Sequence, residues 1–144
     1  MISTRKAVEA DFEFTLCAKE AGYRRHIEAI WGKWDAAWQR AEHKKDFDTG
    51  LLEIITYNGL DAGYLYVRRT GKAINLPDIT ILPEYQGKGI GTYLIKVILA
   101  EARSKNIPVE LGAFKINLSA IKLYKSLGFK QVSETTTHVL MCSL

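Results

Sequence analysis

Three glycines at alternate positions, 87, 89 and 91, are the feature that most restricts how this chain can fold. They lie in the stretch PEYQGKGIGT, residues 83–92, after a run typical of a strand and before a run with helical periodicity. Glycines between a strand and a helix expose backbone N–H groups at the helix N-terminus, where those donors and the helix dipole favour an anion. Without Cβ atoms, the main chain can approach a phosphate closely. A glycine-rich turn that binds nothing is the plainer alternative, and the glycines alone leave both open.

Two common phosphate-binding loops do not match this stretch. A P-loop needs the pattern GxxxxGK[ST], which is absent from the chain. A dinucleotide-binding fingerprint needs GxGxxG, and after Gly87 and Gly89 the third position of that pattern holds Thr92. The sequence therefore disfavours a nucleotide-binding regulatory module.

Composition places the chain among ordinary globular proteins. Its 144 residues fit one domain with a sizeable core, and 47% hydrophobic with 25% charged residues argues against disorder. The net charge of +4 is too small to indicate nucleic acid, although it suits a ligand that carries phosphate. No apolar run is long enough to span a bilayer, and the N-terminus lacks a signal-peptide core. Cys17 and Cys142 form no disulfide framework, which fits a reducing compartment. From these observations together we expect a cytoplasmic protein without a membrane partner.

The expected secondary structure alternates between helices and strands. Asp11 is a plausible N-cap, and the helix that it begins is predicted to end near Gly22. An amphipathic stretch over 23–45 follows and breaks near Gly32, and Asn58–Gly59 is a strong hairpin signal. Strands are expected over 2–6, 51–57, 62–69, 73–82, 107–114, 129–134 and 137–144, and further helices over 92–105 and from Asn117 or Ser119 to Gly128.

The spacing Gln86-x-x-Gly89-x-Gly91 resembles the acyl-CoA signature Q/R-x-x-G-x-G/A of the GNAT superfamily of N-acetyltransferases. The stretch over 79–85 is similar to the strand that precedes the signature in that family. The pattern Asn117-x-x-Ala120-x-x-x-Tyr124, followed by Gly128-Phe129, resembles the family's later helix and its ending. The resemblance covers residues 50–130 and agrees with the order of the expected elements, whereas residues 1–50 fit only in outline.

The resemblance implies a fold and a reaction. The fold is a single α/β domain over residues 1–144, with a mixed, mostly antiparallel sheet of about six to seven strands, about four flanking helices and a splayed, V-shaped slot for CoA. The reaction is transfer of an acetyl group from acetyl-CoA to a primary amine by direct attack in a ternary complex. The acceptor is a small-molecule or peptide amine, and the transferred group could be acetyl or a longer acyl group. Homodimers are common in such families. A catalytically inactive acyl-CoA-binding or sensing domain on the same fold is the alternative.

The cofactor-binding residues implied by the resemblance lie in three places. The pantetheine arm would pair with the backbone of the strand before the loop, and Asn117 and Lys125 would contact CoA from the later helix. A simple helix N-cap explains Asn117 equally well. The loop amides would cradle the CoA pyrophosphate. The expected cofactor-binding residues are Ile79, Thr80, Ile81, Gln86, Gly87, Lys88, Gly89, Ile90, Gly91, Thr92, Asn117 and Lys125.

Acetyl transfer to an amine raises two proton problems. An alkylamine with a pKa of about 10.4 is only about 0.1% free base at pH 7.4, which costs roughly 4 kcal/mol unless a base removes the proton. The departing CoA thiolate also benefits from a proton donor. Tyr124 matches the family's tyrosine in that role, the alternative being a packing tyrosine. Asp78, on the same alternating face as Thr80, is the candidate base; a water chain without a single base is the alternative.

The segment before the strands holds all three tryptophans. Trp31, Trp34 and Trp38 are spaced by three and four, which predicts one helical face packed on the sheet as core. In the alternative, Trp31 and Trp34 form an aromatic wall for a cationic acceptor. The expected acceptor-binding residues are Tyr23, His26, Trp31, Trp34 and Asp35. No metal site is expected, because the histidines lack ligand spacing.

Overall fold

The computed structural model describes residues 1–143, whose contacts divide them into two compact units. The first unit comprises Met1–Tyr66 and Asp78–Ile90, and the second comprises Val67–Pro77 and the chain from Gly91 onward. Each unit is built from segments that are distant in the sequence.

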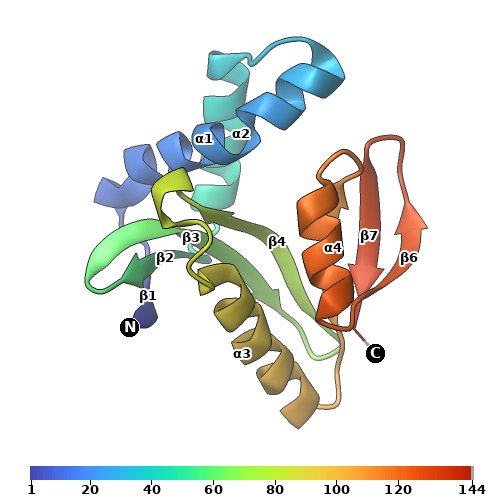
Figure 1. Cartoon of the computed structure of the whole chain (residues 1–144). Coiled ribbons are helices and arrows are strands. Elements are labelled where there is room, and N and C mark those ends of the chain that lie inside the picture. The colour runs from blue at the N-terminus through green and yellow to red at the C-terminus, as the bar shows by residue number, and fades with distance from the viewer. Residues whose placement is uncertain (144) are drawn as a thin grey trace. The chain divides into compact units, whose positions relative to one another are not determined.

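The elements follow the order expected from the sequence (Figure 1). They are β1 (Ile2–Lys6), α1 (Phe12–Trp31), α2 (Ala36–Phe47), β2 (Leu52–Tyr57), β3 (Leu60–Arg69), β4 (Ile74–Ile81), α3 (Ile90–Ser104), β5 (Val109–Phe114), α4 (Leu118–Ser126), β6 (Lys130–Glu134) and β7 (His138–Cys142). Two short 3-10 turns, Glu9–Asp11 and Pro83–Tyr85, precede α1 and the glycine loop.

Hydrogen bonding arranges the seven strands found among residues 1–143 in the order β1-β2-β3-β4-β5-β7-β6. The pairs β1/β2, β2/β3, β5/β7 and β6/β7 are antiparallel, and β4/β5 is parallel. This confirms the expected mixed, mostly antiparallel sheet with four α-helices. The parallel ladder joins Ile74–Leu76 to Val109–Leu111 and ends directly before Pro77, which has no N–H to donate.

The turn between β2 and β3 forms at the predicted dipeptide. Asn58 and Gly59 both have positive φ, 51° and 82°, so the two central residues adopt the left-handed conformation that favours asparagine and glycine. The register pairs Tyr57 with Leu60 across the turn. A bulge between Ile55 and Thr56 shifts the register further along the hairpin.

The prediction that the first helix ends near Gly22 is wrong. Helix α1 continues to Trp31 and ends at Gly32, whose φ of 90° is typical of a C-terminal glycine. A Cβ on Gly22 would lie 3.2 Å from Thr80 Cγ2, so glycine at this position lets α1 pack closely against β4. Asp11 occupies the N-cap position, but its carboxylate accepts from Arg5 and from the Val8 N–H instead of from the helix.

The prediction that the tryptophans share one buried helical face is also wrong. Trp31 ends α1, Trp34 lies between the helices, and Trp38 belongs to α2. Trp31 and Trp38 are 58% and 57% exposed, so neither is a core residue. The break expected near Gly32 is present, and it separates the helical phases of these residues, so their spacing of three and four does not place them on one face.

Each unit has its own buried apolar residues. In the first unit, Ala18 on α1 packs with Leu52, Ile54 and two tyrosines of β3, and α1 and α2 lie side by side (Figure 1). In the second unit, α3 buries one apolar face at Leu94, Ile95, Ile98 and Ala102, in line with the helical periodicity of the sequence. The first-unit core fixes α1 and β3, which carry two of the side chains in the candidate site.

Candidate functional site

The glycine loop connects β4 to α3 within residues 86–89. Gly87 and Gly89 have φ values of 77° and 80°, a conformation that L-residues rarely adopt, which explains two of the three glycines. Helix α3 begins at Ile90, and the first four N–H groups of a helix have no partner inside it. The loop therefore presents a helix N-terminus, as the sequence predicted.

The space beside the glycines is open. A Cβ built on Gly87, Gly89 or Gly91 would have no heavy atom within 4 Å apart from its chain neighbours. Gly91 has no positive φ, so its backbone would accept a side chain without strain. Glycine at this position therefore needs a reason other than the loop's own conformation, and room for a bound group supplies one.

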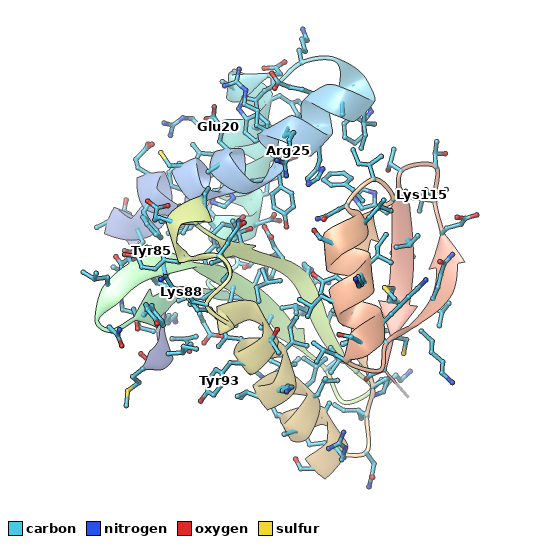
Figure 2. The ribbon with its side chains drawn as sticks, viewed as in Figure 1. Glu20, Arg25, Tyr85, Lys88, Tyr93 and Lys115 are labelled. Carbon is cyan, nitrogen blue, oxygen red and sulfur yellow. The ribbon has the colours of Figure 1, made fainter. Side chains whose placement is uncertain are left out.

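Side chains fix the shape of the loop from its own unit. The Gln86 side-chain amide donates to the Ile81 carbonyl at 3.0 Å, and its backbone N–H donates to Pro83 at 3.2 Å. The Lys88 ammonium lies 5.8 Å from the centre of the Tyr57 ring, which meets the Tyr85 ring edge-on. Figure 2 labels Tyr85 and Lys88 on this segment. Gln86, predicted to bind the cofactor, thus ties the loop to the end of β4.

A carboxylate in β4 is the centre of a hydroxyl cluster. Asp78 Oδ1 accepts from the Tyr23 hydroxyl at 2.5 Å and from Thr80 Oγ1 at 2.9 Å. Asp78 Oδ2 accepts from the Tyr64 hydroxyl. The three donors come from α1, β4 and β3, so the packing of three elements holds the carboxylate in one orientation. We call Asp78, Tyr23, Tyr64 and Thr80 the hydroxyl cluster.

Two glycines allow these elements to close around Thr80. A Cβ on Gly63 in β3 would lie 2.0 Å from the Thr80 carbonyl oxygen, a distance that no side chain can occupy. Gly22 faces the methyl group of the same threonine from α1. The Leu82 N–H donates to the Ala62 carbonyl at 2.8 Å and holds the end of β4 to β3. Close backbone approach thus brings Tyr23 and Tyr64 to one carboxylate.

Burial controls the protonation of the hydroxyl cluster. Burial raises the pKa of Asp78 above its usual range, and the hydrogen bonds from Tyr23, Tyr64 and Thr80 partly oppose that rise. Burial and the neighbouring carboxylate raise the pKa of Tyr64 well above 10, so Tyr64 stays a neutral donor. A carboxylate with a raised pKa accepts a proton more readily near neutral pH than an ordinary aspartate does.

Behind Tyr64 lies a buried histidine. His43 is 1% exposed, and its ring meets the Tyr64 ring edge-on with centroids 5.5 Å apart. Because the Thr15 hydroxyl donates to the Phe12 carbonyl, it accepts from His43 Nε2 at 2.8 Å. Burial lowers the pKa of His43 to about 4, so the ring is neutral at physiological pH. His43 is a satisfied core histidine.

The second unit carries the candidate acid. Tyr124 on α4 is 8% exposed, and its ring centre lies 6.0 Å from that of Phe129. Asn117 caps α4 by accepting from the Ala120 N–H at 3.3 Å, which confirms its N-cap role. Lys125 is exposed in the last turn of α4, where its charge suits the helix dipole.

The structure divides the predicted acceptor residues into two groups. Tyr23 joins Asp78, so two residues that the sequence assigned separately meet in one cluster. His26 follows one turn later on α1, and partial burial together with Arg25 lowers its pKa. Trp31 and Trp34 lie at the end of α1 and beyond it, and Asp35 accepts from the Trp38 N–H as the N-cap of α2.

Sequence reasoning missed Tyr64 and the donor role of Thr80. Tyr64 lies in a run of buried β3 residues, where a tyrosine is ordinarily assigned to the core. The available signal was Gly63, because a glycine inside a strand indicates close backbone approach. The buried tyrosine next to it was therefore a candidate for contact with the neighbouring strand.

A hollow of about 570 Å³ lies along α1 but offers no separate chemistry. It is lined by Cys17, Glu20, Ala21, Arg24, Arg25 and Glu28. Arg24 bridges Glu20 and Glu28 at 2.7 and 3.2 Å, so those three charges satisfy one another. Figure 2 labels Glu20 and Arg25 on this helix. Within residues 1–143 there is no group of three side chains able to hold a metal, and no helix long and apolar enough to cross a membrane.

Comparison with known proteins supplies a family. The model of the family described as "Acetyltransferase (GNAT) family" matches residues 24–129, which include segments of both units. Mouse thialysine N-epsilon-acetyltransferase is 36% identical over 73 residues, or 50% of this chain and 43% of that protein. The matched region thus spans less than half the length of that curated relative.

Solved structures share the fold across nearly the whole chain. The PaiA N-acetyltransferase of Thermoplasma acidophilum, solved with coenzyme A, has a TM-score of 0.82 at 18% identity over 99% of this chain and 98% of that one. A GNAT family acetyltransferase from Elizabethkingia anophelis with acetyl-CoA bound has a TM-score of 0.67 at 16% identity, covering 99% and 97%. At such identities the likeness concerns the fold.

Proposed function

The chain belongs to the GNAT family of acetyltransferases, and from that premise we propose that it transfers an acetyl group from acetyl-CoA to a primary amine. The observation that carries the proposal is the presence, in one unit, of the open loop glycines Gly87 and Gly89 and of a half-buried carboxylate of raised pKa. The loop suits an anionic cofactor and the carboxylate suits removal of a proton.

The loop fits the phosphates of CoA. Open space beside Gly87, Gly89 and Gly91 supports close approach of a pyrophosphate to the backbone at the start of α3. Lys88 is exposed on the same loop and supplies positive charge. The backbone of Ile79–Ile81 is proposed to pair with the pantetheine arm, and the Asn117 side-chain amide, Thr92 and Lys125 are proposed as further contacts. Acetyl-CoA supplies the activated acetyl group.

Two residues of this chain are proposed to handle the protons. Asp78 accepts a proton from the substrate ammonium and leaves a neutral amine. The amine nitrogen attacks the thioester carbon, and the bond from that carbon to sulfur breaks. Tyr124 donates its hydroxyl proton to the departing sulfur and regains one from the nitrogen or from solvent. Asp78 finally releases its proton to solvent.

The acceptor is proposed to be cationic. Asp78 is a half-buried carboxylate that accepts hydrogen bonds from three neutral hydroxyls, so an incoming ammonium would supply the charge that they lack. The exposed Trp31 and the neighbouring Trp34 are proposed to form an aromatic wall, with His26 and Asp35 as polar neighbours. Thialysine, the amine in the name of the mouse relative, is a reasonable first candidate.

The same proposal treats residues 1–144 as one catalytic domain. The family match includes residues from both compact units, which supports a single functional module. Cys17 and Cys142 are unpaired thiols, which supports a reducing, cytoplasmic setting.

The first experiment is calorimetric titration with acetyl-CoA, with ATP and NAD as controls. Protein that binds acetyl-CoA is then assayed with thialysine, lysine, spermidine and a short peptide with a free N-terminus, and the released CoA thiol is detected. We expect binding of acetyl-CoA alone and turnover with at least one amine. Binding without turnover on any amine would favour an acyl-CoA-binding or sensing domain, and competition by ATP or NAD would overturn the cofactor assignment.

Tyr124→Phe tests the proposed acid. Loss of the hydroxyl should lower kcat by about 100-fold, because general acid catalysis typically contributes that much. The affinity for acetyl-CoA should stay within about twofold, since the ring is retained. Unchanged turnover would remove Tyr124 from the mechanism.

A further inference from the structure

The three donors of the hydroxyl cluster differ in their access to solvent. Tyr64 and Thr80 are 1% and 4% exposed, so their hydroxyl groups lie in the interior. Tyr23 on α1 is half-buried and is the one donor of the three that keeps exposed surface. Of the three donors, Tyr23 is therefore the one that an amine from solvent can reach.

The carboxylate also has little room for a direct contact. A carboxylate oxygen offers two lone-pair positions, and at Asp78 Oδ1 both are taken, by Tyr23 and by Thr80. Oδ2 keeps one position, but that oxygen faces the buried Tyr64. A proton from outside thus reaches the carboxylate most directly through a group that already donates to it.

We propose that Tyr23 relays the proton from the acceptor ammonium to Asp78, an inference that rests on the proposed function. One N–H bond of the ammonium breaks and its proton forms a new O–H bond on Tyr23, while the original Tyr23 hydroxyl proton passes to Asp78 Oδ1. The ammonium becomes a neutral amine with a free lone pair, the carboxylate becomes a carboxylic acid, and Tyr23 is a neutral phenol before and after. No oxidant, reductant or further reactant takes part.

The geometry suits such a transfer. The Tyr23 hydroxyl already donates to Asp78 Oδ1, so its proton lies on the path to the carboxylate. The titratable and charged groups that face Asp78 are Tyr23 and Lys19 from α1 and Tyr64 from β3. The charge of Lys19 favours the ionised carboxylate, and Tyr64 is too deeply buried to exchange a proton with a substrate.

Tyr23→Phe and Tyr64→Phe form a matched pair, because each removes one hydroxyl donor from the same carboxylate. Both should raise the apparent pKa on the acidic limb of kcat, since each loses a hydrogen bond to the charged form. Tyr23→Phe alone should also lower the pH-independent plateau, by about 100-fold. Thialysine is the first acceptor used, followed by the other three amines of the panel, and melting temperatures and acetyl-CoA affinities show that each variant is folded.

A second measurement uses the unmodified protein. On the plateau, mixtures of light and heavy water should give a curved dependence of kcat on deuterium content, because two protons move together. A linear dependence would overturn the relay, as would a Tyr23→Phe plateau equal to the wild-type value or equal to that of Tyr64→Phe. These results with an active wild-type protein contradict the relay alone. Wild-type protein that acetylates none of the four amines contradicts the proposed function and the relay with it.

Discussion

The hydroxyl cluster and the glycine loop belong largely to one compact unit, yet they use glycine for opposite purposes. At Gly63 an added Cβ would lie 2.0 Å from a backbone oxygen, and at Gly22 it would press on a threonine methyl. At Gly87 and Gly89 the same atom would meet nothing within 4 Å. The first two glycines let the protein approach itself, and the loop glycines leave space for something else.

This contrast separates two kinds of mutational effect. Substitutions in the packed region should change the free energy of unfolding, because the neighbouring atoms are protein. Substitutions on the open side of the loop should change the affinity for acetyl-CoA and leave stability almost unaffected. Four experiments test the contrast.

Gly63→Ala should have the largest effect. The new methyl group overlaps the Thr80 carbonyl, so β3 and β4 must separate, and we expect a loss of about 3 kcal/mol or more in urea unfolding. Gly91→Ala is the matched control, since its Cβ enters open space on a helix and should be neutral or stabilising by up to about 1 kcal/mol. Equal stability of the two variants would remove the distinction between the regions.

Acidification should weaken the packed region through His43. Burial lowers its pKa from 6.5 to about 4, so the folded state favours the neutral ring. The contribution to stability is complete above pH 6.5 and is lost as the pH falls toward 4, by about 3 kcal/mol. Urea unfolding of wild type and His43→Gln across this range isolates the effect, because the variant lacks the titration. A constant stability difference between the two proteins would contradict the assignment.

Gly91→Glu tests the open side of the loop with a substitution that should not destabilise the fold. A glutamate in the first turn of α3 interacts favourably with the positive end of the helix dipole, so the free energy of unfolding should not fall. The same charge should weaken acetyl-CoA binding about tenfold if the pyrophosphate lies against this turn. Gly91→Gln provides the size without the charge and should bind more tightly than the glutamate variant. Equal affinities would place the phosphates elsewhere.

Lys88→Met should produce the smallest change. The exposed ammonium lies 5.8 Å from the Tyr57 ring, and its removal should cost less than about 1 kcal/mol in stability. Acetyl-CoA affinity should fall about threefold at low salt, with a smaller difference at high salt because exposed charges are screened. An affinity difference that does not depend on salt would argue against a charge contact.

Local signals predicted most of the fold. The dipeptide Asn58–Gly59 identified a hairpin, and the stripe from Leu94 to Ala102 identified α3, because both patterns depend on neighbouring residues alone. Gly22 was misinterpreted for the opposite reason. A glycine in a helix suggests an end, and the contact that keeps it inside α1 comes from Thr80 in another element.

In the candidate site, too, the contiguous part could be predicted from the sequence and the part assembled from distant residues could not. The loop glycines form a contiguous motif, and their positive φ angles agree with the predicted turn. The hydroxyl cluster gathers residues 23, 64, 78 and 80 from α1, β3 and β4, and no periodicity links them.

Strand β1 has a consequence for how the chain folds during synthesis. Ile2 pairs with Tyr57, so β1 finds its partner only after α1, α2 and β2 have been synthesised. Such long sequence separation slows folding, because a large loop must close before any contact stabilises it. The helix that bears Tyr23 lies inside that loop. Docking of β1 thus comes late in folding.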